Sequence, residues 1–317
     1  MDNTGSINKH NSNNSLNREE IIPAVDRNLL LSELNESTYL RNTNYSNNEI
    51  HLVDQRNAPN VLREIGRLRE MSFRAGGGGT GKSLDLDDFD LRANPYQQMI
   101  VWSSEHQEIL GGYRLFDCSK ADFMPDGKPD ITMSRLFNFS DEYLEKFLPQ
   151  SIELGRSFVQ PEFQFRNQKA AVFVLDNLWD GIGAVVRNNP HIKYLFGKVS
   201  IYPHIHQEAQ KLMLSFLNVH FNSGRDLITA IDPVNVPQAS EIFSGEDLKS
   251  DYKLLRSELK AYEAQMPPLI NAYMNLDPAF EIFSTTINTH FGNLIDSAIQ
   301  ITVDKIPEHK RKRYFGE

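Results

Sequence analysis

Two apolar runs joined by a short polar turn constrain the fold of this chain more than any other feature. Residues 97–104 read QQMIVWSS, residues 105–108 read EHQE, and residues 109–117 read ILGGYRLFD. Runs of this kind on either side of a polar turn are typical of a β-hairpin. The chain is therefore expected to contain an antiparallel sheet, and its helices must cover the faces of that sheet.

Helix and strand patterns alternate along the rest of the chain. In residues 169–187, apolar side chains recur at spacings of three and four, which predicts an amphipathic helix. Further helices are expected over residues 25–41, 59–73, 143–148, 206–221 and 247–263, with another segment from Pro267 to Tyr273. Strands are expected over residues 49–55, 151–159, 194–202 and 297–303. This mixed order predicts an α+β domain built around one sheet.

Composition and charge exclude several classes of protein. The net charge of −9 argues against a broad face that binds nucleic acid phosphates, because such faces depend on many Lys and Arg contacts. The single cysteine, Cys118, rules out an intramolecular disulfide and a four-cysteine zinc site, and it fits a reducing compartment. No apolar run approaches the roughly 20 residues of a membrane-spanning helix, and the N-terminus lacks the plan of a signal peptide. We therefore expect a cytoplasmic protein, without a metal site, that can still work at a membrane surface.

The two ends of the chain differ from its middle. Residues 1–20 are mostly Asn, Ser and charged residues with little apolar surface to bury, so they are expected to be disordered. Residues 21–304 are expected to form the folded domain. Residues 305–317 form a basic tail in which five Lys or Arg residues accompany two Glu residues, a local net charge of +3. Such a tail is either a solvated end or a docking surface for an acidic protein or anionic lipids.

Residues 76–83 read GGGGTGKS and match the phosphate-loop pattern letter for letter. That pattern needs a buried strand before the loop and a helix after it. Here the preceding segment has helical periodicity, and the following LDLDDFD brings four Asp residues that would repel a triphosphate. The alternatives are a flexible glycine loop or a mobile loop that closes over a substrate. A nucleotide-binding or regulatory P-loop protein remains the rival function from another class.

A carboxylate and a guanidinium stand three residues apart in the expected strand 151–159. Glu153 and Arg156 point to opposite faces of a regular strand, but one extra residue in a bulge brings them to the same side, and Gly155 between them suits a bulge. Glu153 can then act as a base while Arg156 orients it, and the bulge frees backbone N–H groups that polarise a carbonyl. The competing interpretation is an ordinary surface Glu–Arg pair.

Four segments in a fixed order extend this pattern: LREMSFR (68–74), LDLDDFD (84–90), GGYRLF (111–116) and ELGRSFV (153–159). This arrangement resembles the GNAT-like acyltransferases that take their acyl group from acyl carrier protein. In outline it resembles the acyl-homoserine-lactone synthases, and more closely the bacterial N-acyltransferases that make ornithine and glycine lipids. The resemblance runs from about Leu29 to Val303 and implies a GNAT-like, mixed but mainly antiparallel sheet flanked by helices.

The resemblance also implies roles for individual residues. The family's Arg and Phe on the first long helix match Arg69 and Phe73, its paired Asp residues match Asp87 and Asp90, its hairpin Arg matches Arg114, and its central Glu and Arg match Glu153 and Arg156. In the lactone synthases most of these surround the small amine substrate. The tryptophan that follows the first helix in that family has no counterpart here. This departure weighs against a homoserine-lactone-type substrate, although an N-acyl signal synthase stays an alternative.

The activity implied is transfer of a long 3-hydroxy fatty acyl chain from acyl carrier protein to an amino acid, glycine first and ornithine second. It would be the first step of aminolipid biosynthesis. The acetyl-CoA pyrophosphate loop expected after the central strand is broken at Arg166–Ala171, which favours the phosphopantetheine of a carrier protein over free CoA, with no bound cofactor. Glu153 would accept the amine proton, and backbone N–H groups of Gly155, Ser157 and Phe158 would hold the oxyanion. Arg69, Arg114 or Arg156 would pair with the substrate carboxylate, and Asp87 and Asp90 would attract its ammonium group. The carrier protein or the membrane would dock on the basic residues of the tail, Lys310, Arg311, Lys312 and Arg313.

Overall fold

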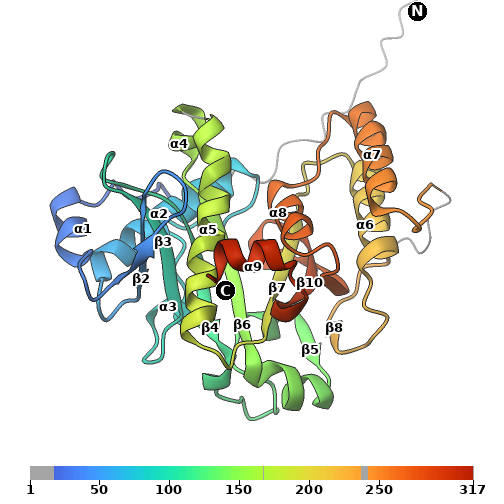
Figure 1. The fold of residues 1–317 in the computed structure, drawn as a ribbon, viewed down its shortest axis with the longest axis horizontal. Coiled ribbons are helices and arrows are strands. Elements are labelled where there is room, and N and C mark those ends of the chain that lie inside the picture. The colour runs from blue at the N-terminus through green and yellow to red at the C-terminus, as the bar shows by residue number, and fades with distance from the viewer. Residues whose placement is uncertain (1–17, 167, 237–241, 317) are drawn as a thin grey trace, which may run out of the picture.

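An eight-stranded sheet forms the centre of the molecule in the computed structural model, which describes residues 18–166, 168–236 and 242–316 (Figure 1). Neighbouring strands are antiparallel except β6 and β7, which run parallel. In spatial order the strands are β1 (Tyr39–Asn42), β2 (Glu49–Val53), β3 (Gln97–Ser103), β4 (Glu108–Asp117), β6 (Ser151–Val159), β7 (Tyr194–Ile201), β10 (Leu294–Thr302) and β9 (Glu281–Asn288). A separate pair joins β5 (Phe137–Phe139) to β8 (Ile228–Ala230).

Helices cover both faces of this sheet. The longest, α5, crosses one face, which we call the α5 face, with α8 and α9 close by (Figure 1). The opposite face, which we call the α2 face, is covered by α2 and by the β5–β8 pair. The helices are α1 (Arg27–Glu33), α2 (Pro59–Ala75), α3 (Asp88–Leu91), α4 (Pro161–Arg166), α5 (Gln168–Asn188), α6 (Gln207–Phe221), α7 (Leu248–Leu259), α8 (Pro268–Leu276) and α9 (Glu308–Tyr314).

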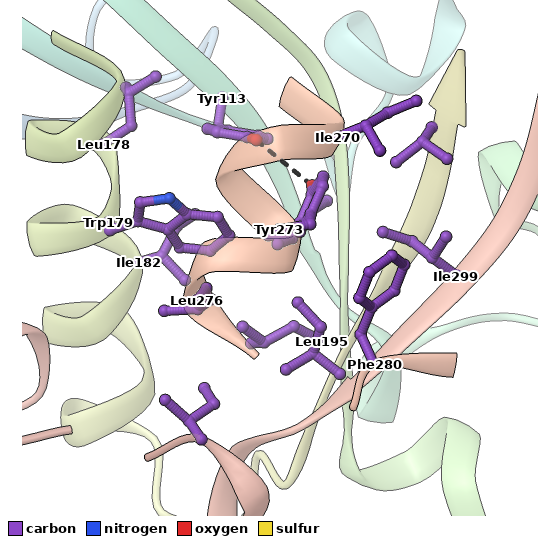
Figure 2. Close-up of a cluster of buried hydrophobic side chains, with 14 of the residues drawn as sticks. Tyr113, Leu178, Trp179, Ile182, Leu195, Ile270, Tyr273, Leu276, Phe280 and Ile299 are labelled. Carbon is purple, nitrogen blue, oxygen red and sulfur yellow. Dashed lines mark hydrogen bonds between the residues drawn. The ribbon is translucent and has the colours of Figure 1, made fainter. Parts of the chain in front are cut away.

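The largest hydrophobic core lies on the α5 face. Leu178 and Trp179 from one turn of α5 and Ile182 from the next pack against strand residues such as Leu195 and Ile299 (Figure 2). Helix α8 closes the cluster with Ile270, Tyr273 and Leu276. Alternate residues of the same strands point to the α2 face, as the period of two requires.

Strands β6 and β7 separate in the middle of the sheet. Their parallel pairing runs from Ser151 and Tyr194 to Leu154 and Gly197, and then it ends although both strands continue. Gly197 permits the last close approach, because a Cβ at this position would lie 2.3 Å from the carbonyl oxygen of Leu154. The separation leaves a slot through the sheet that no strand fills.

Most predicted elements are confirmed, and the corrections are one shortened helix and several short elements, α4 and α9 among them, that were not predicted. The hairpin becomes β3 and β4, and the predicted helices at 59–73 and 169–187 become α2 and α5. The predicted helix at 25–41 was wrong in length, because α1 ends at Glu33 and residues 39–42 form β1. Strands β5, β8 and β9 and helix α3 were not predicted. Residues 1–17 of the segment expected to be disordered lie outside the described residues.

The end of the chain forms a packed helix in the structure. Helix α9 lies against α5, and Tyr314 and Phe315 are buried in the main core. Gly183 of α5 makes this contact possible, since a Cβ there would lie only 2.2 Å from the carbonyl oxygen of Tyr314. No helix in the described parts of the chain is both long and apolar enough to cross a membrane.

Replacing Gly183 with alanine should therefore destabilise the protein. Alanine normally favours a helix interior over glycine by about 1 kcal/mol, but overpacking against a fixed backbone costs about 1–3 kcal/mol. We expect the free energy of unfolding, measured by urea denaturation, to fall. In a chain shortened after Ile306, which lacks α9, the same substitution should be neutral or stabilising; a loss of equal size there would contradict the assigned contact.

Candidate active site

A cavity of about 1000 Å³ occupies the slot between β6 and β7. Its lining comes from both faces of the sheet, so the cavity connects the α2 face with the α5 face. Its α2 side carries the charged side chains of Arg114, Glu153, Arg156 and Lys198 beside the apolar side chains of Phe73, Phe158 and Phe291, and its other side is mainly apolar and aromatic. The lining residues include Phe73, Tyr113, Arg114, Thr132, Met133, Glu153, Leu154, Gly155, Arg156, Ser157, Phe158, Leu175, Lys198, Ser200, Glu263, Leu269 and Tyr273.

Glu153 lies on β6 at the α2 end of the slot, where three donors hold its carboxylate. The hydroxyl of Tyr96 donates to Oε2, and the hydroxyl of Thr132 donates to Oε1. The N–H of Met133 also donates to Oε1, at 3.0 Å. Burial raises the pKa of Glu153 above its usual value, although the Thr132 and Tyr96 hydrogen bonds oppose the shift. A fixed carboxylate with a raised pKa at a cavity wall is suited to accept a proton.

Tyr96 keeps its proton and therefore keeps donating to Glu153. Burial, with the Glu153 charge beside it, raises the pKa of Tyr96 well above its usual value. The N–H of Thr132 donates to the Tyr96 oxygen at 3.1 Å, which turns the tyrosine proton toward the carboxylate. Neither Tyr96 nor Thr132 was selected by sequence reasoning, because both are far from Glu153 in the chain and belong to no recognisable spacing.

The predicted bulge on β6 is confirmed by the strand register. Arg114 of β4 pairs with Gly155 and Gly112 pairs with Phe158, so β6 carries one residue more than β4 over this stretch. The left-handed residue is Arg156, with φ of 49°, and not Gly155 as the sequence suggested. A non-glycine residue held in this region stores backbone strain, which is common at functional sites.

Three arginines and three aspartates form a network beside Glu153 on the α2 face. Asp85 Oδ2 lies 2.9 Å from Nε of both Arg69 and Arg156. Burial opposes ionisation of Asp85, but Arg156, Arg69 and Arg114 outweigh it and hold its pKa below the usual value. Nη1 of Arg114 lies 2.8 Å from a carboxylate oxygen of Asp87 and 3.2 Å from one of Asp90. The other oxygen of Asp90 lies 3.3 Å from Nη1 of Arg69, and the other oxygen of Asp87 lies 3.8 Å from Nη2 of Arg156.

The structure separates the predicted substrate-contacting residues into two groups. Phe73, Arg114 and Arg156 line the cavity. Arg69 and Asp90 do not: both are 0% exposed and their charged atoms face each other, so the expected direct contact with a substrate is wrong for these two. Asp87 caps α3 and pairs with Arg114, so its charge is already balanced by an arginine.

Arg156 differs from the other two arginines. Its guanidinium lies over the ring of Phe291, 4.3 Å from the centroid, and it forms ion pairs with Asp85 and Asp87. Among the described residues, however, it makes no hydrogen bond, and its Nε is buried without an acceptor in suitable geometry. The hydrogen bonds to Glu153 come from Tyr96, Thr132 and Met133, and among the described residues no hydrogen bond or ion pair joins it to Arg156, which was expected to orient it.

The opposite end of the cavity is apolar and lies on the α5 face. Tyr113 of β4 and Tyr273 of α8 meet there, with their hydroxyl oxygens 3.3 Å apart (Figure 2). Leu154, Leu175 and Leu269 complete this end. These side chains had no distinguishing signal in the sequence, where they look like any residues of a hydrophobic core.

The glycine loop is occupied by a side chain of the protein itself. The carboxylate of Glu70 accepts hydrogen bonds from the N–H and hydroxyl of Thr80, at 2.9 and 2.8 Å, and from the N–H of Gly81, at 2.8 Å. The loop follows helix α2 and not a strand, as the sequence indicated. Glu70 therefore takes the place that a phosphate would need, and the nucleotide-binding alternative is not supported.

Two further predicted regions lie away from the cavity. Helix α9 contains Lys310, Arg311, Lys312 and Arg313. Arg313 pairs with Asp176 of α5, and Lys312 pairs with Glu308. The side chains of Lys312 and Arg313 remain exposed. The broken pyrophosphate loop, Arg166–Ala171, spans the junction of α4 and α5, and its side chains lie outside the described residues.

Comparison with known proteins places this site in a family. Residues 68–175 match the acetyltransferase (GNAT) domain. A glycine N(alpha)-acyltransferase of Bacteroides thetaiotaomicron is 46% identical over 94% of this chain and 90% of that protein. One from Phocaeicola vulgatus is 44% identical over 94% of this chain and 93% of that protein. A solved CoA-dependent acyl-homoserine lactone synthase aligns with 72% of this chain and 99% of its own, at 12% identity and a TM-score of 0.31.

The fold is thus that of a GNAT acyltransferase, as the sequence predicted. The identity to the two curated relatives extends over nearly the whole chain, and the chain belongs to their family. It is an N-acyltransferase, an enzyme that forms an amide bond.

The arginine–aspartate network should be essential for stability as well as for the shape of the site. Replacing Asp85 with asparagine leaves Arg69 and Arg156 facing one anion fewer in a buried place, and breaking such a pair costs about 3–5 kcal/mol. The matched control is Asp88→Asn, an exposed aspartate of the same segment. Urea denaturation should show a large loss for Asp85→Asn and almost none for the control; equal effects would contradict the network.

Proposed function

We propose that the enzyme transfers a long 3-hydroxy fatty acyl group from acyl carrier protein to the amine of glycine, with ornithine as the second choice, as the first step of aminolipid biosynthesis. The observation that carries this proposal is one cavity with a carboxylate at one end and an apolar, aromatic wall at the other. A thioester lying in the slot would place its acyl chain toward the α5 face and its carbonyl beside Glu153. The names of the two curated relatives support glycine as the acceptor.

Glu153 is the proposed base. An amino acid's amine is protonated near neutral pH and must lose a proton before it can attack. Glu153, directly or through a water molecule, takes that proton. The nitrogen then forms a bond to the thioester carbon and loses a second proton, the carbon–sulfur bond breaks, and the leaving thiolate takes up a proton, so that one proton is released overall. Because the pKa of Glu153 is raised, the carboxylate binds the proton more readily than an exposed one.

The β6 bulge is the proposed oxyanion site. A bulge interrupts the regular ladder of hydrogen bonds, and the backbone N–H groups around Gly155, Ser157 and Phe158 lie beside the slot. One well-placed donor of this kind contributes about 3 kcal/mol to the transition state. Arg156, which has no hydrogen-bond acceptor of its own among the described residues, is the proposed partner for the acceptor's carboxylate, with Arg114 behind it.

The scarcity of acidic side chains in the cavity favours glycine over ornithine. Among the described lining residues only Glu153 and Glu263 are acidic, and Glu263 is exposed. An ornithine side chain would bring a second ammonium group that needs a partner of its own. Glycine brings none, so it fits the observed charges more simply.

The proposed donor is the acylated phosphopantetheine of acyl carrier protein. Carrier proteins are acidic, and the exposed Lys312 and Arg313 of α9, together with Lys310 and Arg311, offer a basic surface for one. The same residues offer contact with an anionic membrane, where each adds about 1 kcal/mol of attraction. A peripheral location would bring the enzyme close to its lipid-like product.

Glu153→Gln tests the assigned base. We expect kcat with acyl carrier protein and glycine to fall about 10²–10⁴-fold, because the amide cannot take the proton. In the wild type, kcat/KM should rise with pH through the pKa of Glu153, which lies above the usual 4.5, and this limb should be absent in the variant. Glu263→Gln, at the other acidic lining residue, is the control and should stay active. Unchanged turnover in Glu153→Gln would overturn the assignment.

Leu269→Trp tests the position of the acyl chain. Leu269 lines the apolar end of the cavity, and a larger side chain there removes room for the chain. We expect kcat/KM to fall at least tenfold for long acyl donors and little for short ones. Leu254→Trp, at an exposed position on α7, is the control. A uniform loss across chain lengths would mean that the acyl chain lies elsewhere.

A further inference from the structure

Lys198 is a cation of the cavity that the proposed mechanism leaves unused. It lies on β7, directly after Gly197, where the parallel pairing ends. Phe196 is in register with Glu153, and Lys198 follows two residues later, about 7 Å along the strand. Residues two apart share a face, so Lys198 projects from the same face as Glu153, on the opposite wall of the slot from the β6 bulge. Its side chain is 22% exposed and lines the cavity.

A buried carboxylate holds this lysine in place. Asp296 of β10 is 0% exposed, and its Oδ2 accepts from the ammonium group of Lys198 and from Nδ2 of Asn288, the latter at 2.9 Å. Ser200 donates its hydroxyl to Oδ1 at 2.5 Å. Asp296 thus divides its accepting capacity among three donors, two of which are neutral.

Lys198 keeps donors available for a ligand. An ammonium group has three N–H donors, and Asp296 is the one hydrogen-bond partner of Lys198 among the described residues. The cavity around it therefore faces a cation whose hydrogen-bonding capacity is not used up. Arg69 and Arg114, in contrast, already donate hydrogen bonds to aspartates.

We propose that Lys198 binds the carboxylate of the acceptor amino acid from the β7 wall, while Arg156 approaches it from the β6 wall. A carboxylate has two oxygens, so the two cations can take one each. The amine of a small α-amino acid is then directed along the α2 side toward Glu153. Lys198 is by this account a specificity residue that rejects amines without a free carboxylate, and the inference rests on the proposed function.

The test compares glycine with glycinamide, which keeps the amine but lacks the carboxylate. Wild-type enzyme with a long acyl-acyl carrier protein should prefer glycine. In Lys198→Met, kcat/KM for glycine should fall about 10- to 100-fold, the range expected for a lost hydrogen bond to a charged group. The loss should arise mainly through the KM for glycine. The kcat/KM for glycinamide and the KM for the acyl donor should stay unchanged, so the preference for glycine over glycinamide disappears.

Two further variants separate this role from a structural one. Lys198→Met leaves Asp296 buried without its cation, so Lys198→Met/Asp296→Asn removes both charges and should lose the same preference while folding normally. Lys193→Met, at an exposed lysine just before β7, should behave as wild type. An unchanged preference in the double variant, or a rise in the KM for the donor alone, overturns the inference. A wild type that acylates no amino acid overturns the proposed function itself, and with it this inference.

Discussion

The separation of β6 and β7 is the constraint on which the rest of the structure depends. A sheet normally satisfies its backbone groups by continuous pairing, yet here two neighbouring strands pair over four residue positions and then part. The strand on each outer side, β4 or β10, keeps its own pairing and holds the parted strands in position. This gives a slot with rigid walls in the middle of a stable sheet. Such a slot offers the proposed acyl thioester a path from a polar to an apolar environment.

Most charged groups around the slot form ion pairs, and Glu153 is the exception among the buried ones in the described part of the chain. On the α2 face, the arginines balance the aspartates almost one for one, and Lys198 is balanced by Asp296. Glu153 has hydrogen-bond donors but no ion-pair partner in the described structure, and burial raises its pKa although the Thr132 and Tyr96 hydrogen bonds and the charge of Arg114 oppose the shift. The paired charges fix the geometry, and the unpaired carboxylate is the group most ready to change its protonation state.

Local patterns predicted much of the fold, and long-range contacts account for what they missed. Helices α2 and α5 and the β3–β4 hairpin have clear periodicity, and the β6 bulge followed from the spacing of Glu153 and Arg156. Strand β9 carries a mixed burial pattern that gave no signal of its own. The hydroxyls that hold Glu153 come from Tyr96 and Thr132, and only the folded chain brings them near. The context of the GGGGTGKS segment already argued against a phosphate loop, and the folded chain places the carboxylate of Glu70, from the helix before it, in that loop.

The position of β10 has a consequence for how the enzyme is made. Strand β7 is paired along its length with β10, and Asp296, which holds Lys198, also belongs to that strand. A ribosome that has synthesised everything through β7 has therefore not yet supplied the partner that keeps the second wall of the slot in place. Contacts between segments so far apart in sequence form late and slowly. The second wall of the slot, and with it the site, is therefore complete only once β10 has paired with β7.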